Sequence, residues 1–183
     1  MSEYRSLYIN IRIKEEKLQQ FFAEKPAVQP LDSNWIAWWD SRRMYQKQPL
    51  TEIRVSRTAT NGEVFDELIA NRNVMAAEQY DNGAGHWTFV ALMYSENYTE
   101  ILPMLALLKH MATYQGKDGS GVALVYDFYW GDHDVMASMA FEDGQALLQT
   151  HTTTDQLNPE ILAEANRTLN AVLDRLNEQQ FED

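Results

Sequence analysis

Three apolar segments follow one another in the second half of the chain, and only short turn sequences separate them. They span residues 122–130, 135–141 and 146–152, and their content of β-branched and aromatic residues is typical of strands. The intervening sequences, GD at 131–132 and EDG at 142–144, suit tight hairpins. Strands joined by such short turns pair antiparallel. The pattern therefore predicts a three-strand antiparallel meander, which constrains the fold more than any other feature of the sequence.

The remaining chain alternates between strand-like and helix-like patterns. Apolar residues alternate with polar ones over 4–13 and 50–58, and an apolar run covers 86–94, so we expect three further strands, the last of them central in its sheet. Apolar residues at three- and four-residue spacing predict about five helices, over residues 14–24, 32–45, 61–76, 98–114 and from Asn158 and Pro159 onward. This order predicts an α+β fold, in which about five helices cover a mainly antiparallel sheet that ends in the meander.

The composition is that of one folded domain. The 183 residues are 45% hydrophobic, with 8 Gly and 5 Pro, which excludes the low-complexity and disordered classes. The sequence shows no internal repeat and no long linker. We therefore expect a single α+β domain over residues 1–183.

The chain contains no cysteine. Disulfides, thiolate zinc sites, iron–sulfur clusters and a cysteine nucleophile are therefore excluded. The first twenty residues lack the apolar core of a signal peptide, and no segment approaches the roughly 18 apolar residues of a membrane span. We expect a cytoplasmic protein, and no motif indicates a cofactor.

The net charge of −12 is unevenly distributed. Residues 1–58 hold 10 Lys and Arg against 7 Asp and Glu, a net charge of +3, whereas residues 59–183 hold 5 against 20, a net charge of −15. Such a field repels phosphate backbones and anionic lipid surfaces, so it argues against nucleic-acid and membrane binding. It would attract a basic protein partner, although acidity also serves simply to keep a protein in solution.

The segment from Asn34 to Gln46, NWIAWWDSRRMYQ, has the most unusual composition of the chain. Trp, Tyr, Met and Arg are enriched at binding surfaces, because each buries a large area and most keep a polar group available. The candidate partner-binding residues are Trp35, Trp38, Trp39, Arg42 and Arg43. The alternative is that three tryptophans at helical spacing pack into the core of the protein itself.

A second candidate site combines carboxylates and an imidazole near the first hairpin of the meander. Asp127, Asp132, His133 and Asp134 are residue types that bind divalent cations, and an open coordination position on such a cation would activate water. His151 on the third strand is a further candidate. The alternative is a turn in which Asp makes only local hydrogen bonds.

Two other patterns do not match known catalytic motifs. The sequence GKDGSG at 116–121 lacks the Walker spacing, because Lys117 precedes its second glycine and a strand follows. The four histidines form no metal-binding helical pair, and His110 on an apolar helix is typical of a structural histidine.

These observations favour a noncatalytic, acidic protein-binding module, such as an inhibitor, an immunity protein or an adaptor for a basic protein partner. One alternative is a metal-assisted hydrolase that uses Asp127, Asp132, His133 and Asp134. A second alternative is a ligand-binding or homodimeric structural domain, in which the tryptophan segment forms the dimer contact.

Overall fold

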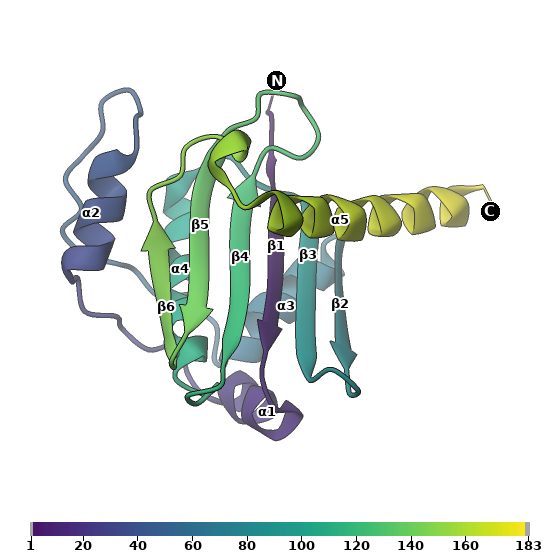
Figure 1. The fold of residues 1–183 in the computed structure, drawn as a ribbon, viewed down its shortest axis with the longest axis horizontal. Helices are drawn as coiled ribbons and strands as arrows, with labels where there is room; N and C mark the ends of the chain where they lie inside the picture. The colour runs from purple at the N-terminus through teal and green to yellow at the C-terminus, as the bar shows by residue number, and fades with distance from the viewer. Residues whose placement is uncertain (1, 182–183) are drawn as a thin grey trace.

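The computed structural model describes residues 2–181, which form one sheet and five α-helices (Figure 1). Every strand pairing in the sheet is antiparallel, in the order β2-β3-β1-β4-β5-β6. The strands are β1 (Arg5–Arg12), β2 (Ala76–Asp81), β3 (His86–Ser95), β4 (Ser120–Tyr126), β5 (Val135–Glu142) and β6 (Gln145–Gln149). The helices are α1 (Glu15–Ala23), α2 (Ser33–Ser41), α3 (Asn61–Ala70), α4 (Tyr98–Ala112) and α5 (Pro159–Gln180), with a short 3-10 helix, η1 (Thr154–Gln156). The predicted α+β class, the mainly antiparallel sheet and the meander β4-β5-β6 are confirmed.

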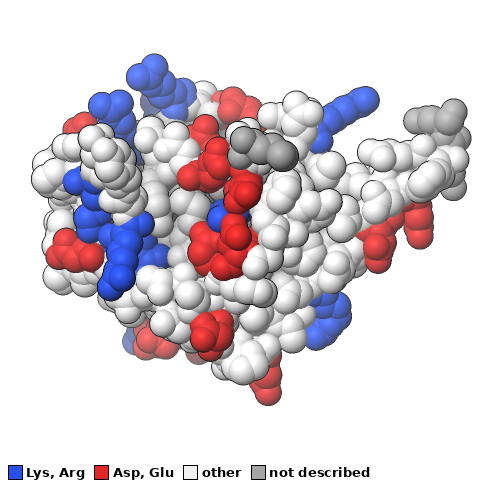
Figure 2. Space-filling view, turned by 90° about the horizontal axis from the view of Figure 1, so that it is seen from above, with Lys and Arg blue, Asp and Glu red and all other residues white. Residues whose placement is uncertain are grey.

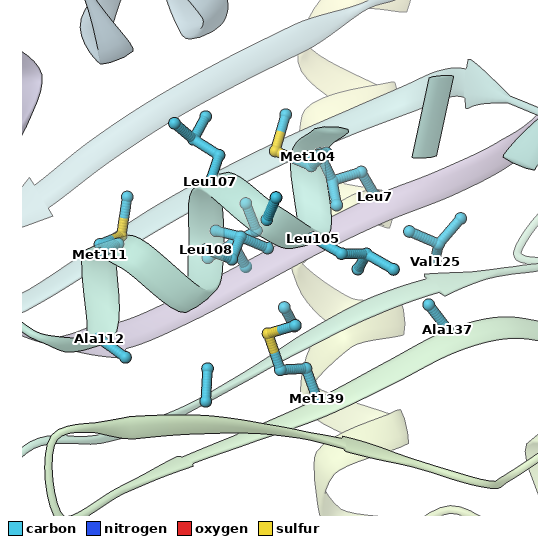
Figure 3. Close-up of a cluster of buried hydrophobic side chains, with 14 of the residues drawn as sticks. Leu7, Met104, Leu105, Leu107, Leu108, Met111, Ala112, Val125, Ala137 and Met139 are labelled. Carbon is cyan, nitrogen blue, oxygen red and sulfur yellow. The ribbon is translucent and has the colours of Figure 1, made fainter. Parts of the chain in front are cut away.

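Helices cover the two faces of the sheet unequally. Helices α1 to α4 pack on one face, whereas α5 alone crosses the other (Figure 1). The buried residues between the sheet and helices α1 to α4 form the first core, and those between the sheet and α5 form the second core. The alternation of β1 follows from this arrangement, since Leu7 and Ile9 lie in the first core and Tyr8 lies in the second. Figure 3 shows the first core where Leu105 and Leu108 of α4 lie against the sheet. Helix α4 is apolar on nearly all sides because it is buried between the sheet and its neighbouring helices.

Two predicted elements are wrong. Residues 50–58 form no strand, although Ile53 is buried in the first core. The helix predicted to reach Ala76 ends at Ala70, and residues Ala76–Asp81 form β2 instead. The reason is tertiary, because β2 pairs with β3 across the turn 82–85 and becomes an edge strand of the sheet. Strand β3 is consequently second from an edge, and β1 and β4 occupy the centre.

The two connections of the meander differ. Asp143 and Gly144 have φ angles of 52° and 74°, which is the left-handed pair that a two-residue type I′ hairpin requires. The first connection is longer than predicted, because β4 ends at Tyr126 and β5 begins at Val135. A loop over 127–134 therefore replaces the expected tight turn, and it carries most of the candidate metal ligands.

Within residues 2–181, no helix combines the length and the apolar composition that a bilayer crossing requires.

Candidate functional site

The tryptophan segment lies inside the protein. Asp32 caps α2 by accepting a hydrogen bond from the backbone N–H of Trp35 at 3.0 Å, and the helix directs its apolar side toward the sheet. Trp35 and Trp38 are 0% exposed and Trp39 is 8% exposed. These rings belong to the first core, so they are unavailable to a partner that meets the folded surface.

Arg42 is also buried, and it ties α2 to the meander. Its guanidinium donates hydrogen bonds from Nη1 to the carbonyl oxygens of Val135 (2.8 Å) and Met136 (2.9 Å), and from Nη2 to that of His151 (2.7 Å). Burial lowers its pKa below the usual value. Of the five predicted partner-binding residues, Arg43 alone is exposed. The burial of these four residues agrees with the core alternative and not with a binding surface.

The loop 127–134 is organised around the buried carboxylate of Asp127. This carboxylate accepts backbone N–H groups from Trp130 (2.8 Å), His133 (3.0 Å) and Asp132. Burial by itself would raise the pKa of Asp127, but these three hydrogen bonds and the charge of Arg5 lower it below its usual value. An aspartate at this position therefore holds the loop in shape, which agrees with the local-turn alternative.

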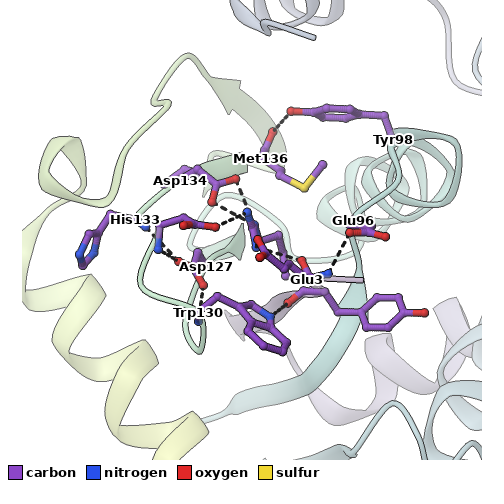
Figure 4. Close-up of polar contacts among 12 residues, drawn as sticks. Glu3, Glu96, Tyr98, Asp127, Trp130, His133, Asp134 and Met136 are labelled. Atoms are coloured by element: carbon purple, nitrogen blue, oxygen red, sulfur yellow. Dashed lines mark hydrogen bonds and ion pairs between the residues drawn. The ribbon is translucent and has the colours of Figure 1, made fainter. Parts of the chain in front are cut away.

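Three carboxylates surround the guanidinium of Arg5 above this loop, and a fourth lies beside Glu3. Arg5 pairs with Asp134 (Nε–Oδ1, 2.9 Å) and Asp132 (Nη2–Oδ2, 3.2 Å), and more loosely with Glu3 (3.9 Å). The backbone N–H of Glu3 donates to Glu96 Oε2 at 3.0 Å. We call these four carboxylates, of Glu3, Glu96, Asp132 and Asp134, the acidic rim. Figure 4 shows the cluster from the side, and Figure 2 shows acidic surface gathered near the centre of this end of the molecule.

The rim carries more negative charge than its one arginine neutralises. The side-chain hydrogen bond and the repulsion between Glu3 and Asp132 raise the pKa of Glu3. The neighbouring carboxylate of Asp132 therefore makes Glu3 harder to ionise. A cation that approached this exposed edge would relieve that repulsion.

The structure brings the predicted metal ligands together only in part. Carboxylate oxygens of Asp127, Asp132 and Asp134 lie within 4.8 Å of one another, whereas the imidazole of His133 points away from them (Figure 4). The oxygens of Asp127 already accept three N–H groups, and Arg5 occupies the position between Asp132 and Asp134 that a divalent cation would need. The geometry therefore favours charge compensation by arginine over metal binding.

His151 lies away from this cluster. Its Nδ1 is 2.9 Å from Oγ of Ser138 on β5. The expectation that it joins the metal ligands is not met.

An open cleft lies beside the loop 127–134, and no local pattern in the sequence indicated it. We call it the rim cleft; its volume is about 1010 Å³ and its walls are the loop 127–134, η1 and α5. Phe128 and Tyr129 contribute aromatic surface, while Asn166 and Asn170 contribute amides from successive turns of α5. The cleft exists because α5, far along the chain, packs beside the loop.

Other aromatic residues line or border this cleft. Tyr126 and Phe128 pack with α5 in the second core, and Trp130 is 37% exposed. The hydroxyl of Tyr126 donates to Asn166 Oδ1 at 2.7 Å and so fixes α5 against the end of β4. The sheet therefore separates these side chains from the tryptophans of α2.

No protein-family model, curated protein or solved structure matches this chain. Its function is therefore inferred from the geometry and charge of the residues themselves.

Proposed function

We propose that the protein is a noncatalytic binding module, and that its acidic rim and rim cleft receive a basic segment of a protein partner. Inhibitors, immunity proteins and adaptors act in this way. The observation that carries the proposal is the acidic rim, in which three carboxylates share one guanidinium and a fourth lies beside Glu3. Two of its residues belong to the loop 127–134, which also forms a wall of the open cleft of about 1010 Å³.

Electrostatics favour a cationic partner over any other class. The excess charge of the rim is reinforced by the net charge of −15 over residues 59–183, and complementary fields accelerate the association of proteins. A lysine or arginine beside Glu3 would favour the ionised carboxylate and lower its raised pKa. Binding should therefore release a proton, and affinity should increase as the pH rises through the range where Glu3 titrates.

The rim cleft supplies the second component of recognition. Tyr129 is 53% exposed, and Phe128 and Leu162 line the same cleft. Aromatic and aliphatic surface of this kind contacts the methylene groups of lysine and arginine and the apolar residues beside them. The hydrogen bonds of Asp127 keep the loop in one conformation, which reduces the entropy lost on binding.

Trp130 offers a direct readout of this site. It is 37% exposed and its Nε1 donates to the carbonyl oxygen of Tyr4 at 3.0 Å, whereas the other four tryptophans are 8% exposed or less. We expect a synthetic lysine-rich peptide to change the fluorescence of Trp130 in a saturable way, and a glutamate-rich peptide of equal length to have no effect. The change should be absent in Trp130→Phe.

Two double variants with the same net charge test whether the rim is the binding site. Glu3→Gln with Asp132→Asn removes two rim carboxylates and leaves the pair of Arg5 and Asp134 intact. Glu142→Gln with Asp143→Asn removes two exposed carboxylates at the other end of β5, and asparagine tolerates the positive φ at that turn.

The rim variant should lose about 5-fold in affinity, because two exposed ion pairs with the peptide are lost. The control variant should stay within about 2-fold of the unmodified protein. Equal losses in the two variants would show that net charge alone attracts the peptide, and they would overturn the proposal.

A further inference from the structure

A second cleft lies at the end of the sheet opposite the acidic rim. We call it the lower cleft; its volume is about 560 Å³. Its walls are the connection from β1 to α1 over 12–15, the β2–β3 turn over 82–85 and the loop over 115–119 that follows α4. In Figure 1 these three segments lie at the lower end of the sheet, away from the N-terminus.

The residues that line the lower cleft have a positive net charge, whereas the net charge of the whole chain is negative. Three cationic side chains line it, those of Arg12, Lys14 and Lys117, against the two carboxylates of Glu15 and Asp118. None of the three cations forms an ion pair within residues 2–181, where the ion pairs use other arginines. Three cations from two separate segments therefore line one cleft of a chain whose net charge is −12.

The walls of the lower cleft are held in place by bonds that leave the cations free. Gln115 Nε2 donates to the carbonyl oxygens of Arg12 (2.8 Å) and Ser120 (2.9 Å), which fastens the loop to β1. Asp81 Oδ1 accepts hydrogen bonds from the backbone N–H groups of Gly83 (2.9 Å) and Ala84 (3.1 Å). This carboxylate therefore makes its hydrogen bonds within its own hairpin turn.

Polar atoms in the same loop are left without partners. The backbone N–H groups of Gly116, Lys117 and Asp118 donate to no acceptor in the described part of the chain. Gln115 Oε1 is buried without a donor. A ligand that accepts several hydrogen bonds and also carries one hydroxyl would satisfy both kinds of atom, and a monoprotonated phosphate group has this combination.

We propose that the lower cleft binds a phosphate group through Arg12, Lys14, Lys117 and the free amides of the loop. The site differs from a P-loop, because a strand follows Lys117 and the cations come from two segments that only the fold brings together. The proposal is independent of the proposed function, since the two sites share no residue.

Titration with inorganic phosphate, followed by amide NMR shifts, tests this site. We expect a dissociation constant of about 1 mM, and the shifts should concentrate on residues 115–119 and 83–85. Glycerol 1-phosphate serves as a second probe, and tighter binding of this monoester would identify a phosphorylated metabolite as the ligand, whereas equal binding would identify free phosphate. Chloride at matched ionic strength is the reference.

Paired variants again distinguish binding at this site from a general effect of net charge. Arg12→Gln with Lys117→Gln should weaken phosphate binding at least about 10-fold, because two charge-assisted contacts are lost. Lys25→Gln with Arg72→Gln removes two exposed cations outside the cleft and should leave binding unchanged. Thermal denaturation establishes that both variants remain folded. Equal losses in the two variants, or shifts that chloride reproduces, would overturn the proposal.

Discussion

Replacing Arg42 tests whether the tryptophan segment is structural. The guanidinium is 3% exposed, and three backbone carbonyl oxygens accept its hydrogen bonds at 2.7–2.9 Å. It also lies 5.7 Å from the ring centroid of Trp38. In Arg42→Met the side chain would still fill much of the space, but the three carbonyls would lose their donor.

The expected cost follows from these contacts. A hydrogen bond to a charged group contributes about 1.5 kcal/mol or more, while the methionine variant avoids the desolvation of a buried guanidinium that has no carboxylate partner. We therefore expect the free energy of unfolding to fall by about 3 kcal/mol. The variant Arg42→Lys keeps the positive charge but lacks the planar guanidinium with its several N–H donors, so its free energy of unfolding should fall by about half as much.

Urea denaturation followed by tryptophan fluorescence measures this loss, with unchanged m-values as evidence of two-state unfolding. Arg43→Met is the matched control, because the neighbouring side chain is exposed and should change stability by less than about 0.5 kcal/mol. An Arg42→Met variant within about 1 kcal/mol of the unmodified protein would refute the structural role. If that stable variant also bound the lysine-rich peptide differently, the original assignment of Arg42 to a partner surface would be restored.

Four further predictions follow from other contacts. Trp38→Ala should cost about 3–5 kcal/mol of stability, seen by denaturation, and a folded variant that changes only its sedimentation from dimer to monomer would contradict the core position. His110 packs edge-on against aromatic rings and burial lowers its pKa below 6.5, so the unfolded chain takes up the proton first and stability should fall as the pH drops below about 6.5. The variant His110→Gln should reduce this fall in stability at low pH, whereas the exposed control His133→Gln should not. If stability fell equally with pH in both variants, the fall could not be assigned to His110. Asn34→Ala removes two 2.9 Å hydrogen bonds that cover the edge of β6 at Leu148, so we expect a loss of about 2 kcal/mol and concentration-dependent light scattering; unchanged scattering and stability would count against this role. Added Ca²⁺, Mg²⁺ or Zn²⁺ should shift the melting temperature by less than about 1 °C, whereas a larger rise that is lost when the acidic rim is neutralised would support the metal-site hypothesis.

The strands of the meander could be predicted because their signals are local. Alternation, β-branched residues and the left-handed pair at Asp143 and Gly144 all act within a few residues of each other. The strand at 76–81 was missed because its sequence, AAEQYD, has little β propensity, and pairing with β3 stabilises it. The strand expected over 50–58 has the right alternation, but this segment pairs with no strand of the sheet and buries only Ile53.

The same division between local sequence signals and tertiary packing applies to the candidate sites. The sequence correctly placed Asp127, Asp132 and Asp134 close together, because one loop carries them. It could not show that Arg5 would stand between them, more than 120 residues away along the chain. It also identified α2 as a helix with aromatic residues on one side, but whether that side met a partner or the core depended on where the helix packed.

The sequence by itself determined the local elements, the uneven charge and the absence of cysteine chemistry, because these depend on composition and on neighbours within a few residues. Only the tertiary structure decided that the tryptophans are core, that Arg42 is a structural tie and that Arg5 compensates the loop carboxylates. It also created the rim cleft and the lower cleft from segments that are distant in sequence. The physical reason is that burial and pairing are properties of the whole packed chain, so a side chain acquires its role only when the fold brings its partner to it.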